Sequence, residues 1–124
     1  MAWQAKPNRS ISTYIIRDLT MLAISARIEL AAKDMAAYIA AAQKIVAPTH
    51  EEPGCHLYAI AVDINLPNVI WITEQWENDD ALLAHLGMPH IVEFMAFCGT
   101  VEITEMDVVR YDISAVGPLV LPEA

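Results

Sequence analysis

The sequence has few cysteines and few basic residues. Its two cysteines, Cys55 and Cys98, form no metal-binding or redox motif, so we expect buried, reduced thiols rather than a disulfide framework. Lysine and arginine together number 7 against 16 aspartates and glutamates, which gives a net charge of −9. A surface of this sign repels nucleic-acid phosphates and anionic lipids, so the sequence predicts no nucleic-acid partner and no membrane partner.

Long hydrophobic runs are also missing. The longest stretch without Asp, Glu, Lys or Arg is Ala81 to Val92, which is 12 residues long and contains two histidines, a glycine and a proline. A membrane-spanning helix needs about 20 apolar residues. Near the N-terminus, Arg17 and Asp18 interrupt the apolar run that begins at Ile11, which is unlike a signal peptide, and we therefore expect a cytoplasmic protein.

Several cofactor motifs are absent as well. The sequence contains no glycine-rich phosphate loop, no dinucleotide fingerprint, no haem-attachment motif and no Gly-x-Ser-x-Gly nucleophile turn. No group of histidines, cysteines and carboxylates has the spacing of a metal site. We therefore expect no cofactor and no metal.

The composition that remains is that of one apolar domain. The 124 residues are 56% hydrophobic and 19% charged, which excludes intrinsic disorder and suffices for a sizeable core. The apolar excess predicts an oligomer. We expect an N-terminal extension over residues 1–18, one folded domain over 19–115 and a C-terminal tail over 116–124.

Hydrophobic periodicity predicts an α+β fold. We expect strands over 20–30, 55–64, 69–77 and within 100–113, and helices from Lys33 to about Pro48, from Asn78 to Leu86 and from Pro89 to about Cys98. The order β-α-β-β-α-β is that of the ferredoxin-like fold, an antiparallel sheet with its helices on one face. The other face, on which Trp71 should lie, needs a cover, and back-to-back pairing of two sheets in a homodimer would provide it.

Local signals indicate where the helices begin and end. Pro48 should end or kink the first helix. Asn78 should cap the second helix, and Gly87 should end it. Pro89 fits the first position of the next helix, and Gly99 should stop it. The expected inner face of that helix consists of Ile91, Phe94, Met95 and Cys98.

An ordered set of short motifs runs through the middle of the chain. It comprises Glu51-Glu52-Pro53-Gly54-Cys55, Tyr58, Glu74-Gln75-Trp76-Glu77, Ala81-Leu82, His85 and Pro89-His90. Over about residues 21–113 this set resembles the antibiotic biosynthesis monooxygenase family, specifically its quinol monooxygenase-like members. The resemblance implies a ferredoxin-like dimer whose sheets join in an α+β barrel. It also implies oxygenation of phenolic or quinol-type aromatics by molecular oxygen without flavin, haem or metal.

Other branches of that family differ at informative positions. The haem-degrading branch carries a tryptophan where this chain has His85 and an iron-ligating histidine where it has Met95, which argues against haem degradation here. A branch that isomerises a phosphorylated dione shares the Pro89-His90 pair but lacks Trp76. The resemblance therefore favours the quinol branch.

The residues themselves place a carboxylate on an apolar strand face. Glu74 and Trp76 are two positions apart on a strand and so share a face with Ile70 and Ile72. A carboxylate there is costly unless it is paired. We expect His85, on the following helix, to be its partner, with the carboxylate orienting the imidazole. The alternative is a structural Glu–His pair that pins the helix to the sheet.

The other histidines are candidates for the same cavity. His90 follows His85 across a helix break that could turn both rings to one side, although it could equally be a partly exposed helix-start residue. His56 should share the strand face of Tyr58 and line the pocket, or be a half-buried strand histidine, and His50 should be solvated in a loop. The expected substrate-binding side chains are Tyr58, His56, His90 and Phe94.

These residues suggest a proton-abstraction mechanism. We expect His85 to act as base, Glu74 to orient it, and Trp76 or Tyr58 to donate a hydrogen bond to the substrate anion. Deprotonating a phenol with free imidazole is uphill by about 5 kcal/mol, which the site must offset. The alternatives are an isomerase of a small phosphorylated dione, or a non-catalytic dimer that binds a small aromatic ligand.

Overall fold

The computed structural model describes residues 16–17 and 20–123. Its elements are β1 (Ile16–Arg17), β2 (Leu22–Leu30), the 3-10 turn η2 (Ala32–Asp34), α1 (Met35–His50), β3 (Cys55–Val62), β4 (Val69–Trp76), α2 (Asp79–Leu86), α3 (Pro89–Cys98), β5 (Ile103–Asp112) and β6 (Ala115–Val116). The predicted α+β order is confirmed. Both ends of β2, β3 and β4 lie within two residues of the expected positions, and β5 lies within the segment 100–113 that was expected to contain it.

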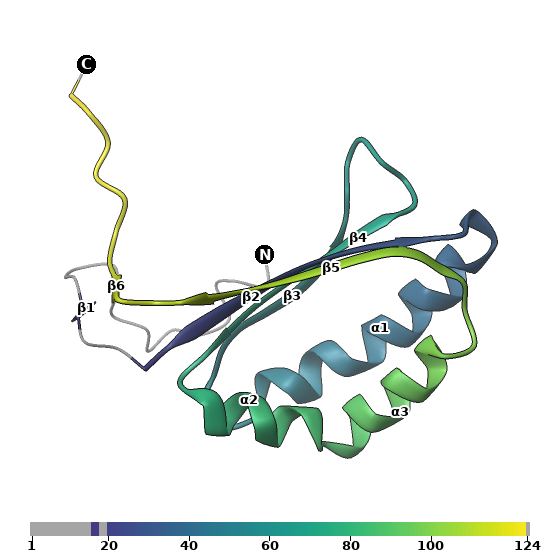
Figure 1. The fold of residues 1–124 in the computed structure, drawn as a ribbon, viewed down its shortest axis with the longest axis horizontal. Helices are drawn as coiled ribbons and strands as arrows, with labels where there is room; N and C mark the ends of the chain where they lie inside the picture. The colour runs from purple at the N-terminus through teal and green to yellow at the C-terminus, as the bar shows by residue number, and fades with distance from the viewer. Residues whose placement is uncertain (1–15, 18–19, 124) are drawn as a thin grey trace.

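Four strands form one antiparallel sheet in the order β3-β4-β2-β5. The three helices lie together on one face of this sheet, which is the ferredoxin-like arrangement (Figure 1). The connection from β2 to β3 runs through α1, and the connection from β4 to β5 runs through α2 and α3. Residues that are far apart in the sequence, at the end of α1 and the start of α3, are thereby brought to one layer.

The core lies between the sheet and the helices. In β2 the side chains that face the helices include Leu22, Ala26 and Leu30, and each is buried. From α1, Tyr38 and Ile45 pack into the same layer. Their spacing in the sequence is the helical period that predicts an apolar stripe. The core is therefore built from the two periodicities that the sequence shows.

The expectation that Pro48 ends or kinks α1 fails in one respect, because α1 continues past it to His50. A proline inside a helix removes one backbone hydrogen bond. At Pro48 the missing donor is the one that would have bonded the carbonyl of Lys44, and the amides of the two residues after it are unaffected. The extra residues matter for the site: Thr49 is fully buried in this last turn, and Glu52 is the second residue after the helix end.

The other helix boundaries follow the sequence. The side chain of Asn78 accepts a 2.9 Å hydrogen bond from the amide of Ala81 and so caps α2. Pro89 is the first residue of α3, as expected.

The predicted inner face of α3 is wrong at Met95. This side chain is 61% exposed on the outer side of the helix, because only Ile91 and Phe94 of α3 turn fully into the core.

Gly54 allows the chain to pass closely beneath α2. It has φ of 80°, a left-handed conformation that only glycine adopts at little cost. A Cβ atom added at Gly54 would lie 2.7 Å from the Cβ of Ala81 and 3.3 Å from the Cβ of Glu77. The carbonyl of Gly54 also accepts a 2.8 Å hydrogen bond from the amide of Glu77. This turn therefore fixes the distance between Glu52 and α2.

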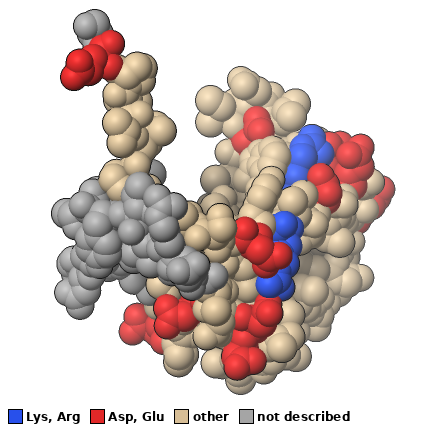
Figure 2. Space-filling view, turned by 60° about the vertical axis from the view of Figure 1, so that its left-hand side comes forward, with Lys and Arg blue, Asp and Glu red and all other residues tan. Residues whose placement is uncertain are grey.

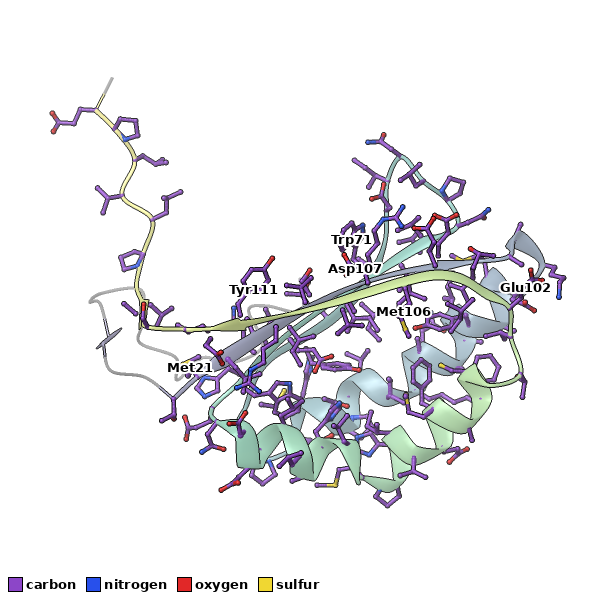
Figure 3. All side chains as sticks on the ribbon, viewed as in Figure 1. Met21, Trp71, Glu102, Met106, Asp107 and Tyr111 are labelled. Carbon is purple, nitrogen blue, oxygen red and sulfur yellow. The ribbon has the colours of Figure 1, made fainter. Side chains whose placement is uncertain are left out.

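No described helix covers the face of the sheet turned away from α1, α2 and α3. We call it the open face, and its exposed large side chains include Trp71, Val109 and Tyr111. Figure 3 shows Trp71 of β4 and Tyr111 of β5 projecting on this side, whereas Met106, also of β5, points to the helical side. The predicted placement of Trp71 opposite to Trp76 is confirmed, and its indole donates a 2.8 Å hydrogen bond to Asp63.

Charged side chains lie in mixed groups on the surface. Figure 2 shows the few basic side chains of one face next to acidic ones, with a broad uncharged area between the groups. Arg27 lies within 4 Å of both Glu29 and Glu105, and Arg110 pairs with Asp79 at 2.7 Å. No basic patch forms among the described residues that could attract a phosphate backbone.

Two short strands near the ends of the described part form a small ribbon. β1 pairs with β6 in a separate two-stranded sheet, so the expected extension and tail touch within their described parts. Residues 1–15, 18 and 19 lie outside the described part, and the proposed domain limits stay predictions. Neither cysteine forms a disulfide, as expected, although Cys98 is only half-buried. No single described helix is long and apolar enough to cross a membrane; only the bent pair α2 and α3 reaches that length together.

Candidate active site

The centre of the candidate site is a carboxylate that contacts two imidazoles. Glu52, in the turn between α1 and β3, places its carboxylate oxygens 3.0 and 3.1 Å from Nδ1 of His85. One of the same oxygens lies 2.8 Å from Nε2 of His90. The side chains of Glu52 and His85 are each 4% exposed, and that of His90 is 22% exposed. The three groups therefore form a hydrogen-bonded unit that reaches from the interior to the surface.

Three separate elements deliver this unit. His85 lies in the last turn of α2, and His90 is the second residue of α3, after the break at Gly87. Across this break both histidines contact the same carboxylate, but only His90 also borders the pocket between α1 and α3, so the expectation that both rings face one cavity is not confirmed. Thr49, in the last turn of α1, adds a hydroxyl 3.2 Å from Nε2 of His90.

Aromatic rings enclose His85. The ring of Trp76 lies 4.6 Å from the imidazole between centroids, and that of Tyr58 lies 5.4 Å away. Trp76 is fully buried and Tyr58 is 3% exposed. Burial raises the pKa of Tyr58 far above its usual range, and the nearby Glu74 carboxylate adds to the effect. Tyr58 therefore stays a neutral phenol and can act only through hydrogen bonding and packing.

The predicted hydrogen bond between Glu74 and His85 is wrong. Glu74 instead accepts a 2.8 Å hydrogen bond from the indole of Trp76, two residues away on the same strand face. A neighbour on the same strand is held close by the backbone, and Nδ1 of His85 is already bound by Glu52. The two groups are nonetheless near enough to interact through charge.

Glu74 remains an unusual carboxyl group. Burial raises its pKa above the usual range. The hydrogen bond from Trp76 and the neighbouring His85 act in the opposite direction, and the Glu52 carboxylate raises the pKa further. Two carboxyl groups thus share one buried region, and only Glu52 is directly bound to the histidines.

Two further histidines lie elsewhere than predicted. A register shift between Cys55 and Leu57 breaks the alternation of β3, so His56 does not share the face of Tyr58. It lies 3.0 Å from the carboxylate of Glu77, outside the cluster. His50 is not solvated as expected, because α1 extends to include it and its Nε2 lies 2.7 Å from the carbonyl of Tyr58.

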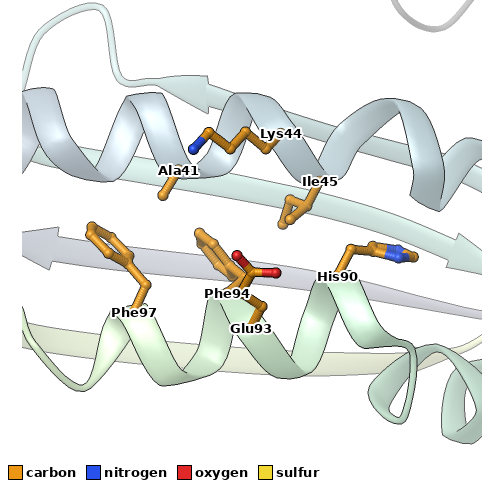
Figure 4. Close-up of a pocket in the computed structure, with 7 residues that line it drawn as sticks. All are labelled: Ala41, Lys44, Ile45, His90, Glu93, Phe94 and Phe97. Atoms are coloured by element: carbon orange, nitrogen blue, oxygen red, sulfur yellow. The ribbon is translucent and has the colours of Figure 1, made fainter.

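A pocket of about 260 Å³ opens between α1 and α3. Figure 4 shows Lys44 and Ile45 on its α1 side and His90, Phe94 and Phe97 on its α3 side. The predicted binding residues His90 and Phe94 therefore line it, whereas Tyr58 and His56 do not. Its walls are mostly apolar, so it suits a small aromatic molecule, and His90 is the member of the Glu52 unit that borders it.

Sequence reasoning missed Glu52 and Thr49. Glu52 stands in the quoted Glu-Glu-Pro-Gly-Cys motif, but nothing in the local pattern separates it from exposed Glu51. The usable signal is that Glu52 stands two positions before Gly54. The chain at Gly54 passes so close to α2 that Glu52 must lie near that helix as well. Among the described residues, no group of three or more His, Cys, Asp or Glu side chains is arranged to hold a metal ion.

Comparison with known proteins gives one family and many related folds. The family model described as antibiotic biosynthesis monooxygenase matches residues 21–96, whereas no curated protein matches the chain. PA3566 from Pseudomonas aeruginosa is 24% identical, with 76% of this chain and 94% of that chain covered and a TM-score of 0.70. SO0527 from Shewanella oneidensis is 17% identical, with coverages of 84% and 100% and a TM-score of 0.72. A structure named antibiotic biosynthesis monooxygenase is 22% identical, with coverages of 74% and 97% and a TM-score of 0.69. At these identities the structural likeness shows the fold alone.

Proposed function

Because the chain belongs to the antibiotic biosynthesis monooxygenase family, we propose that it is a cytoplasmic, homodimeric monooxygenase that oxidises a quinol or phenolic aromatic with molecular oxygen and no cofactor. The observation that carries this proposal is the unit of Glu52, His85 and His90, one end of which borders an apolar pocket. A buried carboxylate bound to two imidazoles is an arrangement that can take up a proton.

The substrate ring is placed in the pocket between α1 and α3. The rings of Phe94 and Phe97 lie 6.4 Å apart at 27° and offer an aromatic wall. A volume of about 260 Å³ accommodates a small fused aromatic. His90, rather than the predicted base His85, is then the imidazole next to the substrate.

The proposed reaction begins with proton transfer. The phenolic O–H bond breaks and the proton moves to His90, leaving a phenolate in the pocket. In water this transfer costs about 5 kcal/mol. The Glu52 carboxylate, 2.8 Å from the ring of His90, offsets part of this cost by stabilising the imidazolium. The predicted role of Glu74 as orienter passes in this proposal to Glu52.

Oxygen then reacts with the substrate anion itself. The anion passes one electron to oxygen, the radical pair combines to form a carbon–oxygen bond, and the proton held on His90 returns to the resulting peroxide. Loss of water leaves a carbonyl where the keto form of the substrate had a ring CH₂. One oxygen atom enters the product and the other leaves as water, and the substrate supplies both hydrogens and all four electrons.

An oxygen-electrode assay with a reduced naphthoquinone or a polyphenol tests this function. We expect oxygen uptake that survives exhaustive chelation and falls by about 10²- to 10⁴-fold in His90→Gln. His56→Gln, whose histidine pairs with Glu77 outside the pocket, is the matched control and should leave the rate unchanged. Loss of activity on chelation that one added metal restores, or equal rates for His90→Gln and the wild type, would contradict the mechanism.

The paired histidines also favour a second candidate function. Two imidazoles on one carboxylate could equally move a proton between two positions of a small dione, which would be an isomerase on the same scaffold. That reaction would incorporate solvent deuterium into the substrate without oxygen uptake. A ligand that quenches tryptophan fluorescence without either reaction would instead indicate a binding module.

A further inference from the structure

Glu52 contacts its two histidines through different ring nitrogens. It meets His85 at Nδ1, at 3.0 and 3.1 Å, and His90 at Nε2, at 2.8 Å. Thr49 contacts the same Nε2 of His90. In both rings, therefore, the second nitrogen makes no hydrogen bond to any residue in the described part of the chain.

This difference fixes where the ring protons lie. An ionised carboxylate only accepts hydrogen bonds, and a neutral imidazole carries a single N–H. The nitrogen that faces Glu52 must then be the protonated one in each ring. His85 is thereby held as the Nδ1–H tautomer and His90 as the Nε2–H tautomer, and the hydroxyl of Thr49 is a second acceptor for the N–H of His90.

We propose that Glu52 is a positioning residue that holds His85 and His90 in opposite tautomers, so that each ring keeps one unprotonated nitrogen free to accept a proton. This inference deepens the proposed function and rests on it for its catalytic meaning. Nδ1 of His90 is then the acceptor that meets a phenolic hydroxyl in the pocket. Nε2 of His85 is a second acceptor in the interior, between Trp76 and Tyr58.

The surroundings of the two rings support this division. His85 is faced by Glu52 from the loop after α1, by Tyr58 from β3 and by Glu74 and Trp76 from β4. None of these groups offers it a cation.

His90 is faced by Glu52 and Thr49 on its inner side. On the pocket side it shares the wall with Lys44 and Glu93, neither of which forms an ion pair with it (Figure 4). Nδ1 of His90 is therefore available to accept a hydrogen bond from a ligand.

Removing the carboxylate tests this role. One oxygen of Glu52 contacts both rings, so the amide oxygen of a glutamine could still accept from both, and glutamine is not a discriminating change. Alanine offers no acceptor to either ring. Because a neutral imidazole without a partner at Nδ1 favours the Nε2–H form, we expect Glu52→Ala to move His85 from the Nδ1–H to the Nε2–H tautomer.

The experiment is ¹⁵N NMR of the imidazole nitrogens in the full chain, assigned for all four histidines. In the wild type, at a pH where both rings are neutral, we expect His85 to show the Nδ1–H pattern and His90 the Nε2–H pattern. Glu52→Ala should switch His85, and Glu51→Ala, a change of the exposed neighbouring carboxylate, should switch neither ring. The same tautomer in both wild-type rings would overturn the inference without any variant, and so would an unchanged His85 pattern in a folded Glu52→Ala protein.

Activity separates this inference from the proposed function. If the substrate assay works, Glu52→Ala should lower kcat by about 10²- to 10⁴-fold, because no carboxylate then orients His90 or stabilises its imidazolium. Opposite tautomers together with no oxygen uptake would refute the monooxygenase and leave the positioning role standing. Oxygen uptake with identical tautomers would refute the positioning role alone.

Discussion

Replacing Gly54 with alanine should disrupt the contact that sets the site. Gly54 has φ of 80°, and an added Cβ would lie 2.7 Å from the Cβ of Ala81 on α2. The atom it meets is close to the helix backbone and cannot swing away. The variant must therefore move α2 or the loop that carries Glu52, which would also lengthen the contact between Glu52 and His85.

Two costs add up in this variant. A non-glycine residue in the left-handed region costs about 1–2 kcal/mol. Forcing an extra methyl group into a packed contact costs about 1–3 kcal/mol. We therefore expect Gly54→Ala to lower the free energy of unfolding by about 2–5 kcal/mol. Gly87→Ala is the control, because a Cβ there meets only the carbonyl of Ala84 at 3.7 Å, and we expect a change within about 0.5 kcal/mol.

Urea unfolding of a double-mutant cycle separates the two costs. Ala81→Gly alone should destabilise the protein by about 1 kcal/mol, through helix propensity. In the background of Gly54→Ala it also removes the atom that clashes, so the double variant should be more stable than additivity predicts by about 1–3 kcal/mol. Additive effects would show that the close approach of the turn to α2 is not what requires glycine.

Three other changes test the core and the open face. Tyr38→Phe should raise the free energy of unfolding in urea by about 1–3 kcal/mol, because the Tyr38 hydroxyl is buried with no hydrogen-bond partner; a loss of stability would mean that the hydroxyl is satisfied. Burial raises the pKa of Glu74, so its contribution to stability is present below its usual pKa and is lost as pH rises through the raised one. Glu74→Gln should therefore gain stability relative to the wild type between pH 4 and pH 7 in urea titrations, and a constant difference would contradict the raised pKa. The wild type should sediment at low micromolar concentration with about twice the chain mass of 13.7 kDa, and Trp71→Asp should sediment as a monomer, because it puts a charge into the open face; a monomeric wild type would contradict the dimer.

The fold could be predicted because its signals are local. The spacing of apolar residues in α1 and β2 and the caps at Asn78 and Pro89 each act within a few residues. The errors arise where tertiary contacts decide. Pro48 removes one backbone hydrogen bond, yet α1 continues past it, and Met95 has the right spacing for the core but lies where no described element covers it.

The site could be predicted only in part. The sequence predicts that His85, Trp76 and Tyr58 lie together, because strand alternation and helix order place them in one layer. It does not predict the partner of His85, because Glu52 is 33 residues away and reaches the ring from a loop. His56 was misplaced by a register shift in β3, and such an irregularity leaves no mark in an alternating pattern.

The edge strand β5 has a consequence for how the protein behaves in concentrated solution. It is ten residues long, pairs with no described strand other than β2, and is exposed along nearly all of its length. An unpaired edge with apolar side chains is a template on which another chain can add a strand and begin an aggregate. Interspersed charges oppose this, and β5 carries Glu105, Asp107, Arg110 and Asp112 among its valines. Three of these four charges are carboxylates, so acidification would remove most of the protection and leave β5 as the place where fibril growth starts.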